Sequence, residues 1–143
     1  MTIRKSGSAH WEGDLKHGKG TISTETGALS EQPYGFNTRF EDKPGTNPEE
    51  LVAAAHASCF TMALSFKLAE AGHTGGSVET QAKVSLEKVD GGFAVTKSAL
   101  STKGDVPGMD RAKFEELAAD AKANCPISKL LDCEITLETA FEG

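Results

Sequence analysis

The stretch TNPEELVAAAHASCF, residues 46–60, determines the central element of this chain. It also raises the question of what a cysteine does in the middle of an apolar helix. Asn47 is a good N-cap and Pro48 suits the first helical position. The two glutamates that follow place negative charge where the helix dipole favours it. The pattern continues to about Glu70, just before a glycine that can end a helix. The stretch therefore predicts a long helix with Cys59 inside an apolar run.

Apolar side chains lie on nearly every face of this predicted helix. They are Leu51, Val52, Ala55, Phe60, Met62, Leu64, Phe66 and Leu68. A helix that is apolar all round is typically buried on all sides. In so small a protein, we expect a central buried helix wrapped by sheet, supplied by one chain or by two.

The other elements follow from turn residues and alternation. Short strands are expected at residues 3–11 and 19–26, and a further one around Tyr34–Phe40. A hairpin is expected from residues 77–89 and 93–101, with its turn at Asp90–Gly92. An amphipathic helix at residues 110–123, a short helix at residues 126–131 and a final strand at residues 133–141 complete the chain. This order predicts an α+β fold with antiparallel sheet, in one domain over residues 1–143.

Charge and hydropathy exclude several classes of function. The formal net charge is −6, and no cluster of Lys or Arg is present, so nucleic acid is not an expected partner. The N-terminal residues lack the apolar core of a signal peptide, and the longest apolar run, Leu51–Ala57, is short and interrupted by His56. We therefore expect a cytoplasmic protein that does not cross a membrane.

The chain has three cysteines, Cys59, Cys125 and Cys133. An odd, small number in a cytoplasmic chain argues against a disulfide framework. Without a Cys-x-x-Cys or His-x-x-x-His pair, no metal site is expected. Cys133 shares the apolar face of its strand with Ile135, so we interpret it as a packing residue.

Cys125 and Cys59 have contrasting predicted surroundings. Cys125 precedes Pro126 and is the expected N-cap of a short helix, where the dipole lowers a thiol pKa. The alternative is a simple helix break. Cys59 lies in mid-helix, where burial raises the thiol pKa, so it becomes a nucleophile only if a cation reaches it. His56, one turn earlier, and Arg39, between two phenylalanines, are the candidates.

Glu49 is too far from Cys59 to touch it within one straight helix. Ten residues correspond to about 15 Å along the axis and ~80° around it. Glu49 can instead orient an arginine that reaches the thiol, or act across a dimer interface. Ordinary charge complementarity at a helix N-terminus is the simpler alternative.

Residues 45–60, GTNPEELVAAAHASCF, together with the CPIS at residues 125–128, resemble the OsmC/Ohr family of osmotically inducible and organic hydroperoxide resistance proteins. The segments GSAHWEGDLKHGKGTIST, QPYGFNTRF and CEITLE are similar to its OsmC branch, so the resemblance covers essentially the whole chain. It implies an OsmC-like fold, with antiparallel sheets around a long buried helix in an intertwined homodimer.

The resemblance also implies a thiol peroxidase of oxidative and osmotic stress that reduces organic hydroperoxides, and H2O2 more weakly. Cys59 matches the peroxidatic cysteine and Cys125 the resolving cysteine, which implies a Cys59 sulfenic acid and then a Cys59–Cys125 disulfide. Arg39 matches the arginine that stabilises thiolate and peroxide, and Glu49 the carboxylate that orients it. An external dithiol is then the reductant, with no cofactor.

Two alternatives stay open on the sequence. A non-catalytic stress or ligand-binding protein with an apolar pocket would use Cys59 and Cys125 only for packing. A hydrolase or acyl transferase would use His56 with Cys59 as a nucleophile pair.

Overall fold

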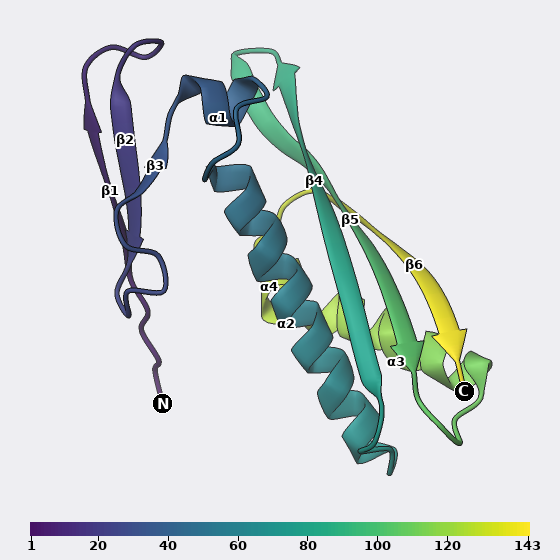
Figure 1. Ribbon diagram of the computed structural model, residues 1–143. Helices are drawn as coiled ribbons and strands as arrows, with labels where there is room; N and C mark the ends of the chain where they lie inside the picture. The colour runs from purple at the N-terminus through teal and green to yellow at the C-terminus, as the bar shows by residue number, and fades with distance from the viewer. The chain divides into compact units, whose positions relative to one another are not determined.

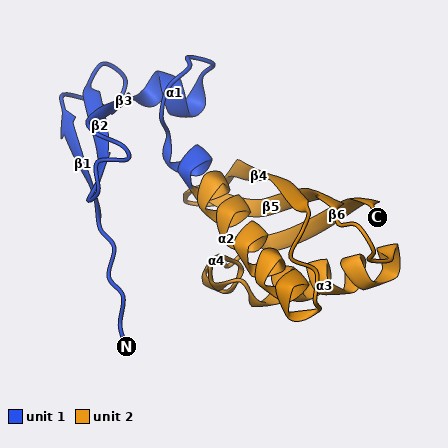
Figure 2. Cartoon of the chain, turned by 60° about the horizontal axis from the view of Figure 1, so that its bottom comes forward, with its two compact units in different colours: residues 1–51 blue, residues 52–143 orange.

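The computed structural model describes residues 1–143, which fall into two compact units, residues 1–51 and residues 52–143 (Figure 2). Each unit is described by itself. The prediction of one domain over the whole chain stays a prediction.

The first unit contains a three-stranded antiparallel sheet in the order β1-β2-β3 (Figure 1). Its strands are β1 (Gly7–Glu12), β2 (Lys19–Thr24) and β3 (Gln32–Tyr34). Trp11 meets Tyr34 edge to face, with ring centroids 5.5 Å apart. Gly20 lies under both rings, and any side chain there would collide with them. The two strands expected before residue 27 are therefore confirmed, and an aromatic pair closes the sheet.

The strand expected around Tyr34–Phe40 is wrong for most of its length. Strand β3 ends at Tyr34, and residues 36–40 form a short helix, α1 (Phe36–Phe40). The Thr38 hydroxyl accepts a hydrogen bond from the Gly35 N–H at 2.9 Å, which caps the start of this turn. Phe36 and Phe40 then stack one turn apart, with centroids 5.0 Å apart. Local capping and this aromatic contact outweigh the strand preference of the aromatic residues.

Helix α2 (Pro48–Glu70) has the bounds that the sequence predicts. The Asn47 carboxamide accepts from the Glu50 N–H at 2.8 Å, which confirms the N-cap. By length and hydropathy alone (1.4 over 18 residues) α2 would also suit a membrane span, as core helices of soluble proteins do. The expectation that the chain crosses no membrane stays a prediction.

The second unit has a three-stranded sheet in the order β4-β5-β6. Strands β4 (Ser77–Val89) and β5 (Gly92–Asp105) form the predicted hairpin. The turn residue Gly91 has φ 88°, a conformation that glycine adopts without strain. Helices α3 (Arg111–Asn124) and α4 (Pro126–Leu130) then lead to β6 (Glu134–Glu142). Except for a register irregularity near Ser85, β4 and β5 pair continuously.

The expectation of purely antiparallel sheet is wrong for the last strand. Strand β6 pairs with β5 in parallel, from Lys97 opposite Glu134 to Asp105 opposite Glu142. A parallel neighbour needs a long crossover, and α3 with α4 supplies one. This crossover places both helices on the same face of the sheet as α2 (Figure 2). Sheet and helices enclose the core, which comprises Phe60, Leu64, Leu68, Leu100, Val106, Met109, Phe114, Leu117, Ala118, Ala121 and Cys125.

Helix α2 is buried along one stripe rather than on all sides of the single chain. Its buried residues recur every fourth position: His56, Phe60, Leu64 and Leu68. Met62 and Phe66 are 76% and 62% exposed. The expected burial on every face is therefore not met within one chain, and an apolar face of α2 stays open.

Candidate active site

The second unit brings Cys59 and Cys125 together, although they are 66 positions apart in the chain. Cys59 lies in the middle of α2 and is partly buried. Cys125 is the N-cap of α4 and only 1% exposed. The two thiols are close enough for each to shift the pKa of the other, and both are free. Two adjacent free thiols of unequal exposure are a pair that oxidation can link.

The first turn of α4 surrounds both sulfur atoms with hydrogen-bond donors. The Ser128 N–H donates to Cys125 Sγ at 3.3 Å, and the Ser128 hydroxyl lies 3.4 Å from the same sulfur. The backbone N–H of Ile127 serves both cysteines. Pro126 at the first helical position supports this turn, as the Cys-Pro pair predicted.

The pKa values of the two thiols are shifted in opposite directions. Burial raises the pKa of Cys59, the Ile127 N–H opposes this, and the adjacent Cys125 raises it further. Burial also acts against ionisation of Cys125, but the Ser128 hydroxyl and N–H, Cys59 and Ile127 outweigh it and lower the pKa. Within this unit, Cys125 is therefore the thiol that ionises first.

An apolar groove, here called the thiol groove, opens beside Cys59 and has a volume of about 640 Å³. Its lining is Ala55, Ser58, Cys59, Met62, Ala63, Phe66, Lys67, Ala121, Asn124, Pro126 and Ile127. Lys67 is held at its rim by Asp120, at 3.0 Å. Cys125 does not line the groove, because it is buried in the core. A small apolar molecule in the groove therefore meets Cys59 and not Cys125.

His56 is not paired with Cys59. It is completely buried, and both ring nitrogens are bonded to hydroxyls: Nδ1 lies 2.6 Å from Ser98 Oγ and Nε2 lies 2.8 Å from Ser128 Oγ. Burial lowers the pKa of His56, so the ring is neutral at pH 7. The geometry gives no support to a His56/Cys59 nucleophile pair.

The first unit brings Arg39 and Glu49 together in a two-pronged ion pair. Arg39 Nε lies 3.0 Å from Glu49 Oε1, and the Arg39 NH2 group lies 2.9 Å from Oε2. The Arg39 guanidinium also lies over the Phe40 ring, 5.2 Å from its centroid. The Glu49 side chain is only 14% exposed, against 37% for Arg39. Arg39 is partly buried and needs a carboxylate partner, and Glu49 is that partner. Part of the guanidinium stays accessible.

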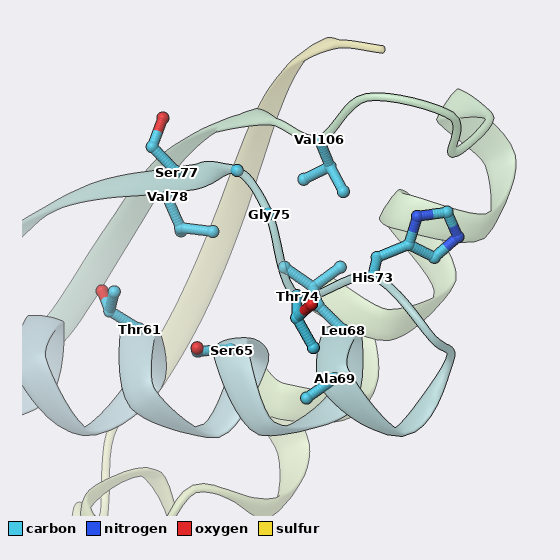
Figure 3. Close-up of a pocket in the computed structure, with 11 residues that line it drawn as sticks. Thr61, Ser65, Leu68, Ala69, His73, Thr74, Gly75, Ser77, Val78 and Val106 are labelled. Atoms are coloured by element: carbon cyan, nitrogen blue, oxygen red, sulfur yellow. The ribbon is translucent and has the colours of Figure 1, made fainter.

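A second cavity of about 250 Å³ lies near the other end of α2 (Figure 3). Figure 3 shows Thr61 and Ser65 on α2 facing Ser77 and Val78 at the start of β4, with Thr74 beside Leu68 and His73 at the other end of the lining. It contains no thiol and no charged side chain. Cys133, partly buried ahead of β6, also lies outside the thiol groove.

No group of three or more His, Cys, Asp or Glu side chains is placed to hold a metal ion. The sequence reasoning missed Ser128, which joins His56 to Cys125, and Ser98, which bonds the other ring nitrogen of His56. Ser128 had a sequence signal, because it is the third residue after a cysteine N-cap and its N–H meets that side chain. Ser98 had none, since only the folded sheet brings it to His56.

A cysteine that lines an apolar groove, with a second free cysteine buried next to it, is typical of proteins with thiol-based redox chemistry. Comparison with known proteins makes the class specific. The family model OsmC-like protein matches residues 40–140, and the chain belongs to the OsmC-like family.

Three relatives show how far this similarity extends. The chain is 62% identical over 138 residues to Peroxiredoxin OsmC of Escherichia coli, covering 96% of each chain. It is 33% identical over 111 residues to organic hydroperoxide resistance protein OhrB of Bacillus subtilis, covering 77% of this chain and 79% of the relative. An OsmC-like protein of unknown function from Vibrio cholerae has the same fold, with a TM-score of 0.77 at 20% identity, covering 96% of this chain and 99% of that one.

Proposed function

We propose that this chain is a cysteine-based peroxidase that reduces organic hydroperoxides, with Cys59 as the attacking thiol and Cys125 as the resolving thiol. The observation that carries the proposal is the difference in access between two adjacent thiols. Cys59 lines the apolar thiol groove, whereas Cys125 is buried directly behind it. The name of the Escherichia coli relative, a peroxiredoxin, and that of the Bacillus relative support the same activity.

The first step oxidises Cys59. Its thiolate attacks the outer oxygen of the hydroperoxide, an S–O bond forms, and the O–O bond breaks. Sulfur loses two electrons and becomes a sulfenic acid, and the leaving alkoxide takes up a proton and departs as the alcohol. An apolar groove favours alkyl and aryl hydroperoxides over H2O2, since burying their carbon atoms is worth about 25 cal/mol per Å².

The second step joins the two cysteines. The Cys125 thiolate attacks the sulfenic sulfur, an S–S bond forms, and hydroxide leaves and takes up a proton to become water. An external dithiol then reduces the disulfide with two electrons and two protons, and is itself oxidised to a disulfide. No cofactor enters these steps.

Arg39 supplies the positive charge in this proposal. A raised pKa leaves Cys59 a weak nucleophile in the second unit alone. The guanidinium beside the thiol would lower that pKa and stabilise the charge on the leaving oxygen. Glu49 orients Arg39 through its two-pronged pair.

The assembled protein is proposed to be a cytoplasmic homodimer. The open apolar face of α2, with Met62 and Phe66, is the surface that a second chain would cover. Sedimentation would then give a particle of twice the chain mass of 15.1 kDa.

The test is consumption of cumene hydroperoxide with dithiothreitol as the reductant. Wild type should remove the peroxide catalytically, and faster than it removes H2O2. Cys59→Ser should reduce the rate to that of dithiothreitol alone, while the matched control Cys133→Ser keeps it. A wild type no faster than dithiothreitol alone would leave the groove as a binding site and contradict the proposal.

A further inference from the structure

A chain of buried hydrogen bonds leads from β5 to Cys125, and the reaction steps above do not use it. Ser98 Oγ meets His56 Nδ1 at 2.6 Å, His56 Nε2 meets Ser128 Oγ at 2.8 Å, and Ser128 Oγ meets Cys125 Sγ at 3.4 Å. Ser98 and His56 are 0% exposed, Cys125 1% and Ser128 8%. Three elements, β5, α2 and α4, therefore contribute to one polar cluster inside an apolar core.

Counting protons restricts this cluster to two arrangements while the ring is neutral. Ser128 has one hydroxyl proton and two neighbours, so it donates either to Cys125 or to His56. If it donates to Cys125, then His56 Nε2 must carry hydrogen and Nδ1 must accept from Ser98. If Ser128 donates to His56 instead, Cys125 must be the donor to Ser128, and Nδ1–H donates to Ser98. The tautomer of His56 is thus linked to the protonation of Cys125.

Only one of the two arrangements suits a thiolate. A thiolate accepts hydrogen bonds and donates none, so it requires the Ser128 hydroxyl to point at Cys125 and hydrogen on Nε2. The Ser128 N–H already points at this sulfur, and the Ile127 N–H also lowers the pKa of Cys125. The ionisable group that interacts with Cys125 directly is Cys59, so no fixed charge competes with these donors.

We propose that His56 and Ser128 are positioning residues for the resolving step: Ser98 fixes the His56 ring, and His56 directs the Ser128 hydroxyl to Cys125, which meets the Cys59 sulfenic acid as a thiolate. This inference rests on the proposed function for the step it serves. The resolving thiol is buried and has no cation among its contacts, so hydrogen bonds must supply what solvent and charge do not. The proton that Cys125 gives up balances the one that the departing hydroxide takes up.

The first experiment needs no peroxide and so tests the inference apart from the proposed function. In a chain carrying Cys59→Ser and Cys133→Ser, Cys125 is the remaining thiol, and its thiolate absorbance near 240 nm can be titrated. Ser128→Ala should move the titration midpoint to higher pH. Ser128→Thr, which keeps a hydroxyl, should restore it, and the exposed Ser101→Ala on β5 should leave it unchanged. An unmoved midpoint in folded Ser128→Ala would overturn the inference.

The second experiment observes the ring itself. In the same chain labelled with ¹⁵N-histidine, His56 should be the Nε2–H tautomer above the Cys125 midpoint and should shift toward Nδ1–H below it. Ser98→Ala removes the hydroxyl that accepts from Nδ1–H, so it should weaken this shift. A tautomer that does not respond to ionisation of Cys125 would contradict the linkage even if Ser128→Ala folds poorly.

The third experiment measures the step. In the chain with all cysteines, Ser128→Ala should slow disulfide formation about tenfold, the value of one hydrogen bond to a charged group. Dimedone trapping should then detect more Cys59 sulfenic acid, formed at an unchanged rate. Failure of peroxide to oxidise Cys59 at all would refute the proposed function without touching the first two results. Oxidation followed by unslowed resolution would refute the role of Ser128 alone.

Discussion

Cys59 and Cys125 lie side by side, yet their surroundings are opposite in two respects. Cys59 is in the middle of a long helix, lines an open apolar groove, and has a raised pKa. Cys125 begins a short helix, is 1% exposed, and has a lowered pKa. The more acidic thiol is therefore the one that a peroxide cannot reach. Access favours Cys59 and acidity favours Cys125, and the proposed mechanism therefore lets access determine the order of reaction and assigns the activation of Cys59 to a cation from outside this unit.

The largest effect should separate the two roles. Cys59→Ser should abolish oxidation by cumene hydroperoxide, because the thiol groove then contains no thiol. Cys125→Ser should keep a single rapid oxidation but stop turnover, since the sulfenic acid has no partner and proceeds to sulfinic acid with excess peroxide. Whole-protein mass spectrometry after one and ten equivalents of peroxide distinguishes them. Equal loss of the first oxidation in both variants would contradict the division of roles.

The next effect should come from the ion pair of the first unit. In the proposed mechanism Arg39 supplies the charge that offsets the burial of Cys59, so Arg39→Gln should lower the rate of Cys59 oxidation about 100-fold. The exposed Arg111→Gln on α3 is the matched control and should keep the wild-type rate. Stopped-flow oxidation with cumene hydroperoxide measures both. A wild-type rate in Arg39→Gln would show that Cys59 is activated by other groups.

A smaller effect should appear in substrate preference. Phe66 lines the thiol groove and is 62% exposed, whereas Phe93 is 57% exposed on β5 outside the groove. Phe66→Ser should lower the ratio of kcat/KM for cumene hydroperoxide to that for H2O2 about tenfold, the loss expected for one to two kcal/mol of apolar contact. Phe93→Ser should leave the ratio unchanged. Using the ratio cancels any loss of assembly common to both substrates.

The smallest effect is expected at the third cysteine. Cys133→Ser should change the free energy of unfolding by less than about 1 kcal/mol and leave turnover unchanged, because Cys133 is partly exposed and outside the thiol groove. Urea unfolding and the peroxidase assay test this. A turnover defect would show that Cys133 takes part in disulfide exchange.

Much of the fold could be predicted because the deciding interactions are local. Asn47 and Pro48 define the start of α2, and Cys125 with Pro126 defines the start of α4. The cap made by Gly35 and Thr38 is also local but resembles a turn before a strand, so α1 was missed. The parallel pairing of β6 was missed because it depends on how α3 and α4 cross the sheet rather than on the strand itself.

The site could be predicted where its chemistry depends on residue type and local position, and not where it depends on partners far away in the sequence. The contrast between Cys59 and Cys125 follows from mid-helix and N-cap positions. His56 could not be interpreted, because its two partners lie 42 and 72 positions further along the chain. The exposure of Met62 and Phe66 was likewise unpredictable, since hydrophobicity alone cannot say whether the same chain or a second one covers a side chain.

The most direct test of the account is to add one equivalent of cumene hydroperoxide to the fully reduced protein, count free thiols and map the bridges by mass spectrometry. The account predicts loss of two thiols, a single bridge between Cys59 and Cys125, and a Cys133 that is still free. The bridge should form faster with cumene hydroperoxide than with H2O2. Persistence of all three thiols, or a bridge that includes Cys133 in place of Cys125, would contradict it.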